Sequence, residues 1–500
     1  MKIDLSVILN LHDETPFLKR TFASLRQAAS YANAQGIKVE LVVVLDNAPD
    51  TVRNWIATYP FVEYAQFRVL EVSNRSLGLS RNDGIAAASG DYIATADADD
   101  LVSYNFLYGM LETASAAGAD AIVCAQHTYS FGDTSYWRVY SGSEDISPLA
   151  LFGGNPFSSR VLAHRTIFER IPYQDSPDAV TAFEDWHFNC EAIANGCRFH
   201  IASDTILFYR QRANSIMDRS RDYIMRYSQL FAADLYEKYC SEPYRNMTEL
   251  PEAGVPHGMP GINDLLSSAL ICELVDAASQ IDPAINLAQI SHTPVGYAMT
   301  TPVSPGCAYY ECVELIQGKT FTDVFVISYA GPSMAGQRLL DVIRRKTAAH
   351  PERKILVVLG TSQILDEDLM QQDQITVADL HGISQRWQIA DYDMLALRLI
   401  QTVGSEAWLH LDTGRLTFGL FRRYSAALKN RSVFYYFRNL FLEQDPLADG
   451  DAFNFLSEFS DTLNSIILDN PQTLEFLEAR LELRPDHCDL LMPGVIESGE

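Results

Sequence analysis

The chain has 500 residues, of which 47% are hydrophobic, 11% aromatic and 20% charged, and this composition excludes a disordered or fibrous protein. Its length is too great for one ordinary hydrophobic core, so we expect two or three domains. The formal net charge of −26 argues against nucleic acid as a partner, because binding to nucleic acid needs basic surface that releases counterions.

The first 100 residues alternate short apolar runs with helical stretches. Strands are predicted at 5–9, 39–45, 67–72 and 92–96, and helices at 16–34 and 80–88. The second run, VELVVVL, is continuous and rich in valine, which is typical of a parallel strand buried on both faces. Repeated strand–helix–strand units predict an α/β fold with a mostly parallel sheet flanked by helices.

Polar residues come directly after three of these predicted strands. They are Asn10, Asp46 and Asp97. In open α/β sheets ligands bind beyond the carboxyl ends of the strands, which meet at one edge of the sheet. We therefore expect a ligand site at this edge.

The motif Asp97-Ala98-Asp99-Asp100 is the most acidic part of that edge. The spacing of Asp97 and Asp99 places two carboxylates on one side of an extended backbone, where they repel each other unless a cation or a proton lies between them. Ligation by oxygen alone favours Mg²⁺ or Mn²⁺ bridging to phosphates. Taken alone, the motif leaves open an acidic turn that binds nothing.

Two further residues favour a binding site over an acidic turn. Asp46 ends a buried strand, where a carboxylate can accept hydrogen bonds from a base or a ribose. Arg81 lies one helical turn beyond Gly78, where a fixed guanidinium can meet a diphosphate. The structural alternatives are a turn-initiating aspartate and a solvated helix residue.

The remainder of the chain predicts two more regions after a first domain at 1–222. Residues 223–318 are helical to about 280 and then rich in Pro, Gly and Thr, so we expect a helical and irregular connecting region. Strands at 322–328, 354–360, 406–411 and 432–436 predict a second, Rossmann-like α/β domain at 319–500.

Neither a membrane-spanning segment nor a disulfide framework is visible in the sequence. No apolar stretch reaches the ~18 residues needed to cross a bilayer. The eight cysteines are scattered without a C-x-x-C pair, so we interpret them as buried thiols of a cytoplasmic protein. Such a chain can still act at the inner face of the membrane through a peripheral contact.

The motifs of the first domain resemble those of the family 2 glycosyltransferases of GT-A fold, in order as well as spacing. The matching strings are VILNLHDE at 7–14, LDN at 45–47, NRSLGLSRNDGI at 74–85, GDYI at 90–93, DADD at 97–100, FEDW at 183–186 and YRQRANSI at 209–216. The resemblance covers residues 1 to about 220.

This resemblance implies a site for a nucleoside-diphosphate sugar, with a UDP-sugar favoured. The residues that it assigns to nucleotide-sugar binding are Asn10, Glu14, Asp46, Arg81, Asp97 and Arg212. Asp97 and Asp99 would hold Mn²⁺ or Mg²⁺, with Asp99 as the direct ligand. Asp185 would be the general base that removes the proton of the acceptor hydroxyl.

Arg212 departs from the family pattern, since many relatives have a histidine two residues after the Tyr-Arg pair. An arginine cannot ligate a cation, but it can bind a diphosphate directly. We therefore expect Arg212 to complement the metal rather than coordinate it.

The implied activity is that of a metal-dependent inverting glycosyltransferase that acts on a hydroxyl of a glycan or lipid-linked acceptor in surface polysaccharide synthesis, lipopolysaccharide included. Two alternatives stay open at this point: a nucleotidyltransferase, and a non-catalytic sugar-binding or scaffold protein with a vestigial site. The absence of a glycine-rich loop after the first strand argues against the nucleotidyltransferase.

The second α/β domain resembles the N-terminal, acceptor-side half of a family 4-type GT-B glycosyltransferase. The strings concerned are SYAGPSMAGQR at 328–338 and LHLDTG at 409–414. A complete GT-B enzyme needs a second half, which residues 480–500 could only begin. We expect either a degenerate acceptor or scaffold domain or, as the favoured interpretation, the front of a longer bifunctional chain.

Overall fold

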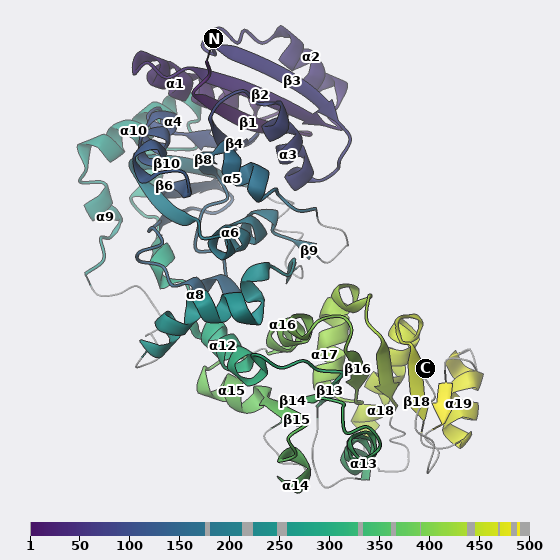
Figure 1. Ribbon diagram of the computed structural model, residues 1–500. Helices are drawn as coiled ribbons and strands as arrows, with labels where there is room; N and C mark the ends of the chain where they lie inside the picture. Colours follow the sequence, from purple (N-terminus) through teal and green to yellow (C-terminus); the bar gives the residue numbers. More distant parts are fainter. Residues whose placement is uncertain are drawn as a thin grey trace. The chain divides into compact units, whose positions relative to one another are not determined.

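The computed structural model describes residues 2–175, 181–212, 224–247, 258–328, 334–361, 367–390, 392–437, 446–468, 471–481 and 488–490. The chain divides into two compact units, one formed by Met1–Leu230 with Pro251–Val303 and the other by Phe231–Leu250 with Ser304–Glu500. In each unit helices flank a mostly parallel sheet (Figure 1), which confirms the predicted α/β class. The stretch 223–318, expected as a connecting region, contributes to both units.

The first unit opens with alternating strands and helices. They are β1 (Leu5–Leu11), α1 (Leu18–Ala34), β2 (Val39–Asp46), α2 (Asp50–Thr58), β3 (Gln66–Val72), α3 (Leu77–Ala87), β4 (Tyr92–Asp97) and β5 (Leu101–Val102). The strands predicted in this part are all present.

The later elements of this unit are longer and more varied. They are α4 (Phe106–Ala117), β6 (Ala121–Gly132), β7 (Tyr136–Val139), β8 (Val161–His164), α5 (Arg165–Arg170), β9 (Thr181–Ala182), α6 (Glu184–Ala194), β10 (Arg198–Gln211), β11 (Ile224–Met225), α9 (Ile262–Leu265), α10 (Ala269–Ile281), α11 (Leu287–Ile290) and β12 (Val295–Tyr297).

The main sheet runs in the order β12-β7-β6-β8-β4-β1-β2-β3, and β10 lies along β6 and also pairs with β5. The strands β4, β1, β2 and β3 are parallel to one another. β8 is antiparallel to both of its neighbours. The four parallel strands therefore present their carboxyl ends at one edge, where the sequence predicts the site.

The two faces of the parallel strands pack against different helices. The odd-numbered residues of β1, such as Val7 and Leu9, share a core with Phe22 and Leu25 of α1 and with residues of α4. The opposite face meets α3, where a Cβ on Gly84 would lie 2.5 Å from Ile8 Cγ2 and 2.8 Å from Val44 Cγ2. The α3 backbone thus approaches the sheet closely, and only a glycine fits at position 84.

The second unit contains one seven-stranded sheet in the order β15-β14-β13-β16-β17-β18-β19, with all neighbours parallel. Its strands are β13 (Asp323–Ile327), β14 (Ile355–Leu359), β15 (Ile375–Asp379), β16 (Trp408–Leu411), β17 (Val433–Tyr436), β18 (Ser465–Leu468) and β19 (Cys488–Leu490). Its helices are α8 (Ala233–Arg245), α12 (Ser304–Ile316), α13 (Met334–Ala349), α14 (Glu367–Met370), α15 (Leu380–Arg386), α16 (Asp393–Val403), α17 (Arg415–Tyr424), α18 (Pro446–Phe459) and α19 (Pro471–Leu481).

The helix α12 lies in a stretch that the sequence analysis expected to be irregular. Pro305 occupies its first turn, where the missing N–H costs no helical hydrogen bond. The apolar face of α12 packs on α8 and α16, and Tyr236 of α8 donates a 3.0 Å hydrogen bond to the carbonyl oxygen of Gly306. Packing within the second unit, rather than local periodicity, stabilises this helix.

The glycine-bearing turn after β13, which supports the GT-B resemblance, falls at 329–333 and lies outside the described residues. Ser328, which precedes it, caps α17: its Oγ accepts hydrogen bonds from the backbone N–H of Leu416 at 3.1 Å and of Thr417 at 3.3 Å. The start of α17 therefore has a side-chain partner within the protein.

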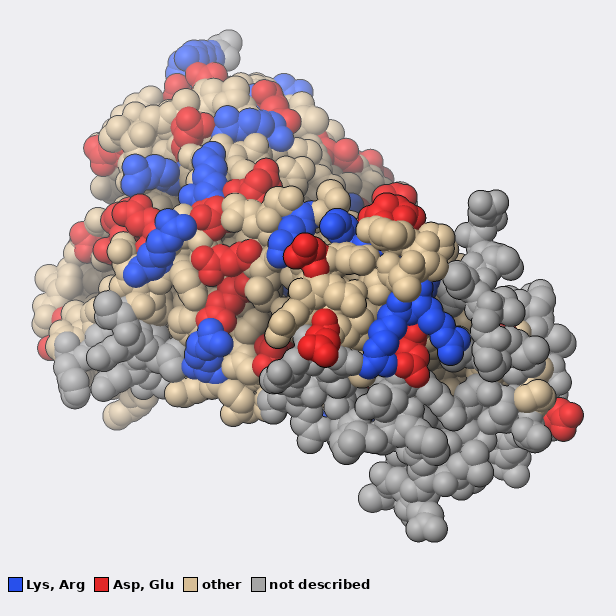
Figure 2. Space-filling view, turned by 60° about the horizontal axis from the view of Figure 1, so that its bottom comes forward, with Lys and Arg blue, Asp and Glu red and all other residues tan. Residues whose placement is uncertain are grey.

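Basic and acidic side chains lie interspersed on the face of the molecule shown in Figure 2. Such mixed charges are solvated and interact only modestly with one another. Among the described residues, no helix is both long enough and apolar enough to cross a bilayer.

We expect Gly84→Val to lower the free energy of unfolding by about 2 to 3 kcal/mol, because its methyl groups would overlap Ile8 and Val44. Ala86→Val is the matched control, since residue 86 lies on the exposed side of the same helix and should cost about 0.5 kcal/mol through helix propensity. Urea denaturation of the two variants measures the difference. Equal losses would contradict the close approach of α3 to the sheet.

Candidate functional site

Three of the predicted site residues lie at the carboxyl edge of the parallel strands, as expected. In the β1–β4 register Asn10 is paired with Asp97, and Asp46 is the last residue of β2, on the other side of β1. Neither amide atom of Asn10 has a hydrogen-bond partner among the described residues, although the side chain is buried. A buried amide without partners is costly, so a bound ligand at this edge would find a free donor and a free acceptor.

The Asp46 carboxylate anchors the loop that leads into α3 by hydrogen bonds. Its carboxylate accepts hydrogen bonds from Asn47 Nδ2 at 2.7 Å, Ser80 Oγ at 2.9 Å and the backbone N–H of Arg75 at 3.1 Å. Burial opposes the ionisation of Asp46, but these donors outweigh it and lower its pKa. Asp46 is thus ionised, and it fixes the residues that begin α3.

Arg81 joins α3 to two other parts of the site. Its side chain is 1% exposed, and its guanidinium makes ion pairs of 2.9 Å with Asp97 Oδ1 and 2.8 Å with Glu184 Oε1. The ring of Tyr173 lies 5.2 Å from the guanidinium carbon. The contact of Arg81 with a nucleotide stays a prediction. In the structure Arg81 connects the acidic motif with the start of α6.

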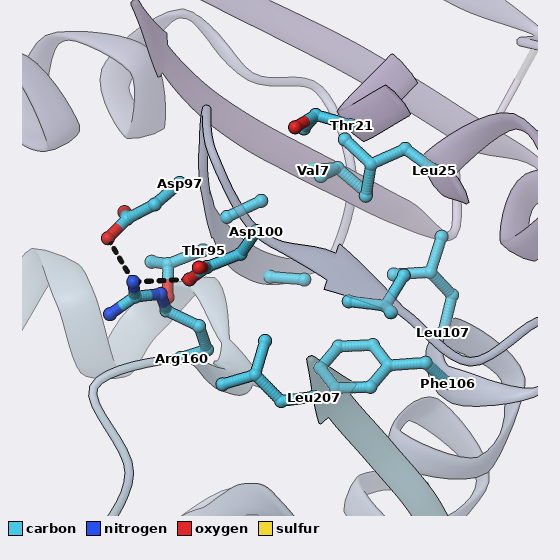
Figure 3. A pocket seen from close by; sticks show the side chains of 13 residues that line it. Val7, Thr21, Leu25, Thr95, Asp97, Asp100, Phe106, Leu107, Arg160 and Leu207 are labelled. Atoms are coloured by element: carbon cyan, nitrogen blue, oxygen red, sulfur yellow. Dashed lines mark hydrogen bonds and ion pairs between the residues drawn. The ribbon is translucent and has the colours of Figure 1, made fainter. Parts of the chain in front are cut away.

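Arg160, which no sequence motif indicates, is the second counter-charge of the acidic motif. It precedes β8, and its Nη2 lies 2.5 Å from Asp97 Oδ2 and 2.5 Å from Asp100 Oδ2. Figure 3 shows the guanidinium between these two carboxylates. Burial opposes the ionisation of Asp97, but the charges of Arg160 and Arg81 outweigh it and lower the pKa of Asp97.

Asp100 is the most deeply buried aspartate of the motif, at 4% exposed. Besides Arg160, it accepts a 3.0 Å hydrogen bond from the backbone N–H of Arg210. Burial raises its pKa to about 7, against the attraction of Arg160. A small cavity beside it is lined by apolar side chains that include Val7, Leu25 and Leu107 (Figure 3), and such apolar surroundings strengthen both the burial penalty and the ion pairs.

Asp99 differs from its two neighbours because its ion-pair partner is partly exposed. Arg212 Nε lies 3.0 Å from Asp99 Oδ2, and the Arg212 side chain is 40% exposed. Burial, followed by the charge of Asp97, raises the pKa of Asp99, and the charge of Arg212 opposes this shift. The charges of Asp99 and Arg212 also act on Glu14, whose pKa is raised by burial. The structure thus brings together three of the predicted residues.

Arg210, which pairs with Asp282 from a later part of the chain, also contacts the acidic motif. Arg210 donates from Nε to the Asp99 carbonyl oxygen at 3.0 Å, and its Nη2 pairs with Asp282 at 2.6 Å. The guanidinium carbon of Arg210 lies 4.8 Å from the ring centre of Phe17 and 4.5 Å from that of Phe131. Asp282, which follows α10, was not indicated by any motif.

Asp185 lies in the first turn of α6, next to Glu184. Burial, followed by the charge of Glu184, raises the pKa of Asp185 to about 6, and the charge of Arg81 opposes the shift. Asn155 Nδ2 donates a 3.3 Å hydrogen bond to Asp185 Oδ2. A carboxylate with a pKa near 6 is ionised at neutral pH and is also basic enough to accept a proton from a hydroxyl as it reacts.

The two aromatic residues that follow Asp185 have structural contacts. Trp186 donates from Nε1 to the carbonyl oxygen of Leu151 at 2.9 Å. His187 is 5% exposed and lies 3.6 Å from Glu191 on the same helix. For Trp186, these contacts agree with a packed tryptophan, which the sequence left as an alternative to a sugar platform.

Within the described part of the chain, no three His, Cys, Asp or Glu side chains converge on a metal-sized site. The acidic motif instead offers single carboxylates, each beside an arginine. Of the string at 209–216, residues 213–216 lie outside the described residues.

Three residues of the site escaped sequence reasoning: Asn155, Arg160 and Asp282. Arg160 is one arginine in front of an apolar run, and Asn155 lies in a turn-like stretch with two glycines. A charged residue directly before a buried strand was the one available indication for Arg160, because buried arginines need a partner. Nothing local distinguishes Asn155 or Asp282.

Residues 6–178 match the family model described as Glycosyl transferase family 2. The glycosyltransferase EpsJ of Bacillus subtilis (strain 168) is 28% identical over 224 residues, which are 43% of this chain and 62% of EpsJ. The succinoglycan biosynthesis protein ExoO of Rhizobium meliloti (strain 1021) is 38% identical over 205 residues, 38% of this chain and 58% of ExoO. The chain therefore spans less than two thirds of the length of either relative.

Among solved structures, residues 1–349 of S. aureus TarS in complex with UDP-GlcNAc are similar to this chain, with 14% identity and a TM-score of 0.36. The similarity covers 64% of this chain and 93% of that structure. The family resemblance of the motifs is confirmed by the match to the family model over residues 6–178.

We expect Arg160→Met to lower the free energy of unfolding by about 3 kcal/mol at pH 8, because it leaves Asp97 and Asp100 buried without their shared counter-charge. The loss should shrink at pH 5.5, since Asp100 has a raised pKa and protonation removes its buried charge.

Arg170→Met is the matched control, because Arg170 pairs with Asp120 where both side chains are about half exposed. It should cost less than about 1 kcal/mol at either pH. Urea unfolding at the two pH values measures both effects. A loss for Arg160→Met that does not depend on pH would contradict the proposed charge balance.

Proposed function

We propose that the first unit, whose residues 6–178 match the family model of the family 2 glycosyltransferases, transfers a sugar from a nucleoside diphosphate to a hydroxyl group of a glycan or lipid-linked acceptor. One observation carries the proposal. A basic carboxylate, Asp185, and a charge-balanced acidic motif are joined through Glu184 and Arg81 into one cluster at the edge of the sheet. A group that takes up a proton and a site for a diphosphate are the two requirements of this reaction.

The reaction that fits the cluster is a single displacement with inversion. The acceptor oxygen forms a bond to the anomeric carbon as the bond from that carbon to the diphosphate oxygen breaks. The proton of the acceptor hydroxyl passes to Asp185, and the electron pair of the breaking bond leaves with the nucleoside diphosphate. The raised pKa of Asp185 makes it a stronger base than an exposed aspartate.

The diphosphate would lie beside Asp99 and Arg212. Arg212 is partly exposed, so its guanidinium can turn from Asp99 to two phosphate oxygens. Asn10, Glu14 and Asp46 border the same edge and would receive the nucleoside, with Asn10 supplying its unpartnered amide.

The donor atoms at this edge fit a hard divalent cation. Asp99 is an oxygen ligand whose pKa is raised by burial and by Asp97, so a nearby cation would stabilise its ionised form. Asp97 has an arginine at each carboxylate oxygen, which leaves Asp99 as the direct ligand. When bound, Mn²⁺ or Mg²⁺ would neutralise charge on the departing diphosphate.

The relatives support a role in polysaccharide assembly. ExoO is named a succinoglycan biosynthesis protein, and residues 6–178, which match the family model, include Asn10, Asp46 and Asp97 at the edge of the sheet. We infer that the acceptor is a growing glycan or its lipid-linked precursor and that the donor is a UDP-sugar.

Asp185→Asn should reduce the transfer rate by a factor of 10² to 10⁴, the usual contribution of a general base, with little change in nucleotide affinity. Release of nucleoside diphosphate from a panel of UDP- and GDP-sugars measures the rate, and calorimetry measures UDP binding. Asp133→Asn, in an exposed turn, is the control and should keep the wild-type rate. Turnover by Asp185→Asn at the wild-type rate would sink the proposed role of Asp185.

Turnover should require Mn²⁺ or Mg²⁺ and stop after treatment with EDTA, because a divalent cation would stabilise the leaving diphosphate. Asp99→Asn should raise the metal concentration for half-maximal rate by about tenfold or more. A titration with Mn²⁺ at saturating donor measures this shift, again with Asp133→Asn as control. Full activity in EDTA would refute the metal requirement but not the transfer reaction.

A further inference from the structure

Asn155 has the only side-chain amide that contacts Asp185 among the described residues. It lies between β7 and β8 in sequence, and its Nδ2 donates to Asp185 Oδ2 at 3.3 Å. The two residues are 30 positions apart, so this contact depends on the tertiary fold. A donor held at a carboxylate favours the ionised form and restricts its orientation.

The orientation of the Asn155 amide is fixed by the groups around its oxygen. Asn155 Oδ1 accepts a 3.0 Å hydrogen bond from Asn189 Nδ2 and a 3.4 Å hydrogen bond from the backbone N–H of Phe157. With two donors at the oxygen, the NH₂ group must point the other way, towards Asp185. Asn189 is 1% exposed and lies one helical turn after Asp185 on α6. Asp185 and Asn189, the residue that orients Asn155, therefore lie on the same face of α6.

The backbone of Asn155 is anchored as well. Arg138 of β7 donates from Nη2 to the Asn155 carbonyl oxygen at 3.2 Å and to Thr301 Oγ1 at 3.4 Å. The Arg138 guanidinium lies 5.2 Å from the ring centre of Tyr140. Asn155 is consequently held by α6, by β7 and by its own loop.

The charged groups that act on Asp185 are Glu184 on its own helix, Arg81 on α3 and Arg160 before β8. Burial and Glu184 favour the protonated form, while the two arginines and the backbone N–H of Trp186 favour the ionised form. The uncharged amide donor of Asn155 also favours the ionised form of Asp185.

We propose that Asn155 is a positioning residue for Asp185, and that Asn189 keeps its amide in the donating orientation. The inference rests on the proposed function, since it assigns Asn155 to the orientation of the general base. The amide of Asn155 limits how far burial can raise the pKa of Asp185. It also holds the carboxylate in one orientation relative to the acceptor hydroxyl.

The test is the pH dependence of donor turnover by the full-length chain carrying Asn155→Ala. Loss of one hydrogen bond to a carboxylate should move the acidic limb of the kcat profile up by about one pH unit. With a wild-type pKa of about 6, the rate at pH 6 should then fall about fivefold more than the rate at pH 8.5. The same donor, one that the wild-type chain turns over, is used for every variant.

Two further variants make the result specific. Asn189→Leu keeps Asn155 but removes the donor that orients it, and should shift the limb in the same direction by a smaller amount. Asn54→Ala, at an exposed position of α2, should leave the profile unchanged. A fall by one constant factor at every pH, or an unchanged profile, would overturn the proposal, because a merely structural asparagine has no reason to change a titration.

A second measurement does not depend on turnover. Because Asn155 stabilises ionised Asp185, the loss of Tm caused by Asn155→Ala should be larger at pH 8, above the pKa of about 6, than at pH 5, below it. A loss of Tm that is equal at the two pH values would contradict the inference even if the enzyme is active. If no donor is turned over by the wild-type chain while the Tm loss follows pH as stated, the proposed function fails and the Asn155–Asp185 contact stands.

Discussion

The balance of charge at the carboxyl edge of the first sheet is the constraint on which the rest of the unit depends. Three aspartates within the range 97–100 would repel one another strongly at low dielectric. Their counter-charges come from three separate parts of the chain: Arg81 on α3, Arg160 before β8 and Arg212 after β10. The acidic motif is therefore neutralised only where these three segments lie beside it, so the charge balance of the site depends on the tertiary fold.

The same edge holds carboxylates of opposite character. Asp97 is ionised because two guanidinium groups outweigh its burial, whereas Asp185 has a raised pKa because burial and Glu184 outweigh Arg81. Pairs of carboxylates with pKa values pushed apart are a common arrangement in enzymes, since one group then carries fixed charge and the other moves a proton. Arg81 and its neighbour Glu184 connect the two environments.

The sequence predicted those elements of the fold that are encoded by a continuous run of residues. The valine-rich run of β2 and the polar residues Asn10, Asp46 and Asp97 after their strands were sufficient to predict a parallel sheet and the edge with the site. Arg160 is 60 residues away in sequence from its partner Asp100, and Asp282 is 72 residues away from Arg210, which contacts the motif. Sequence periodicity does not predict such long-range contacts. The helix α12 was missed for the same reason, because its stability comes from packing on α8 and α16.

The two compact units are interlaced along the chain. The first is built from Met1–Leu230 and Pro251–Val303, and the second takes Phe231–Leu250 from between them. Since the polypeptide passes between the units three times, no single cut of the backbone separates one from the other. A fragment that ends after β10 would also lack Asp282, the carboxylate that pairs with Arg210 behind the acidic motif. The boundary of the first unit is therefore set by the topology of the chain and does not correspond to a single position in the sequence.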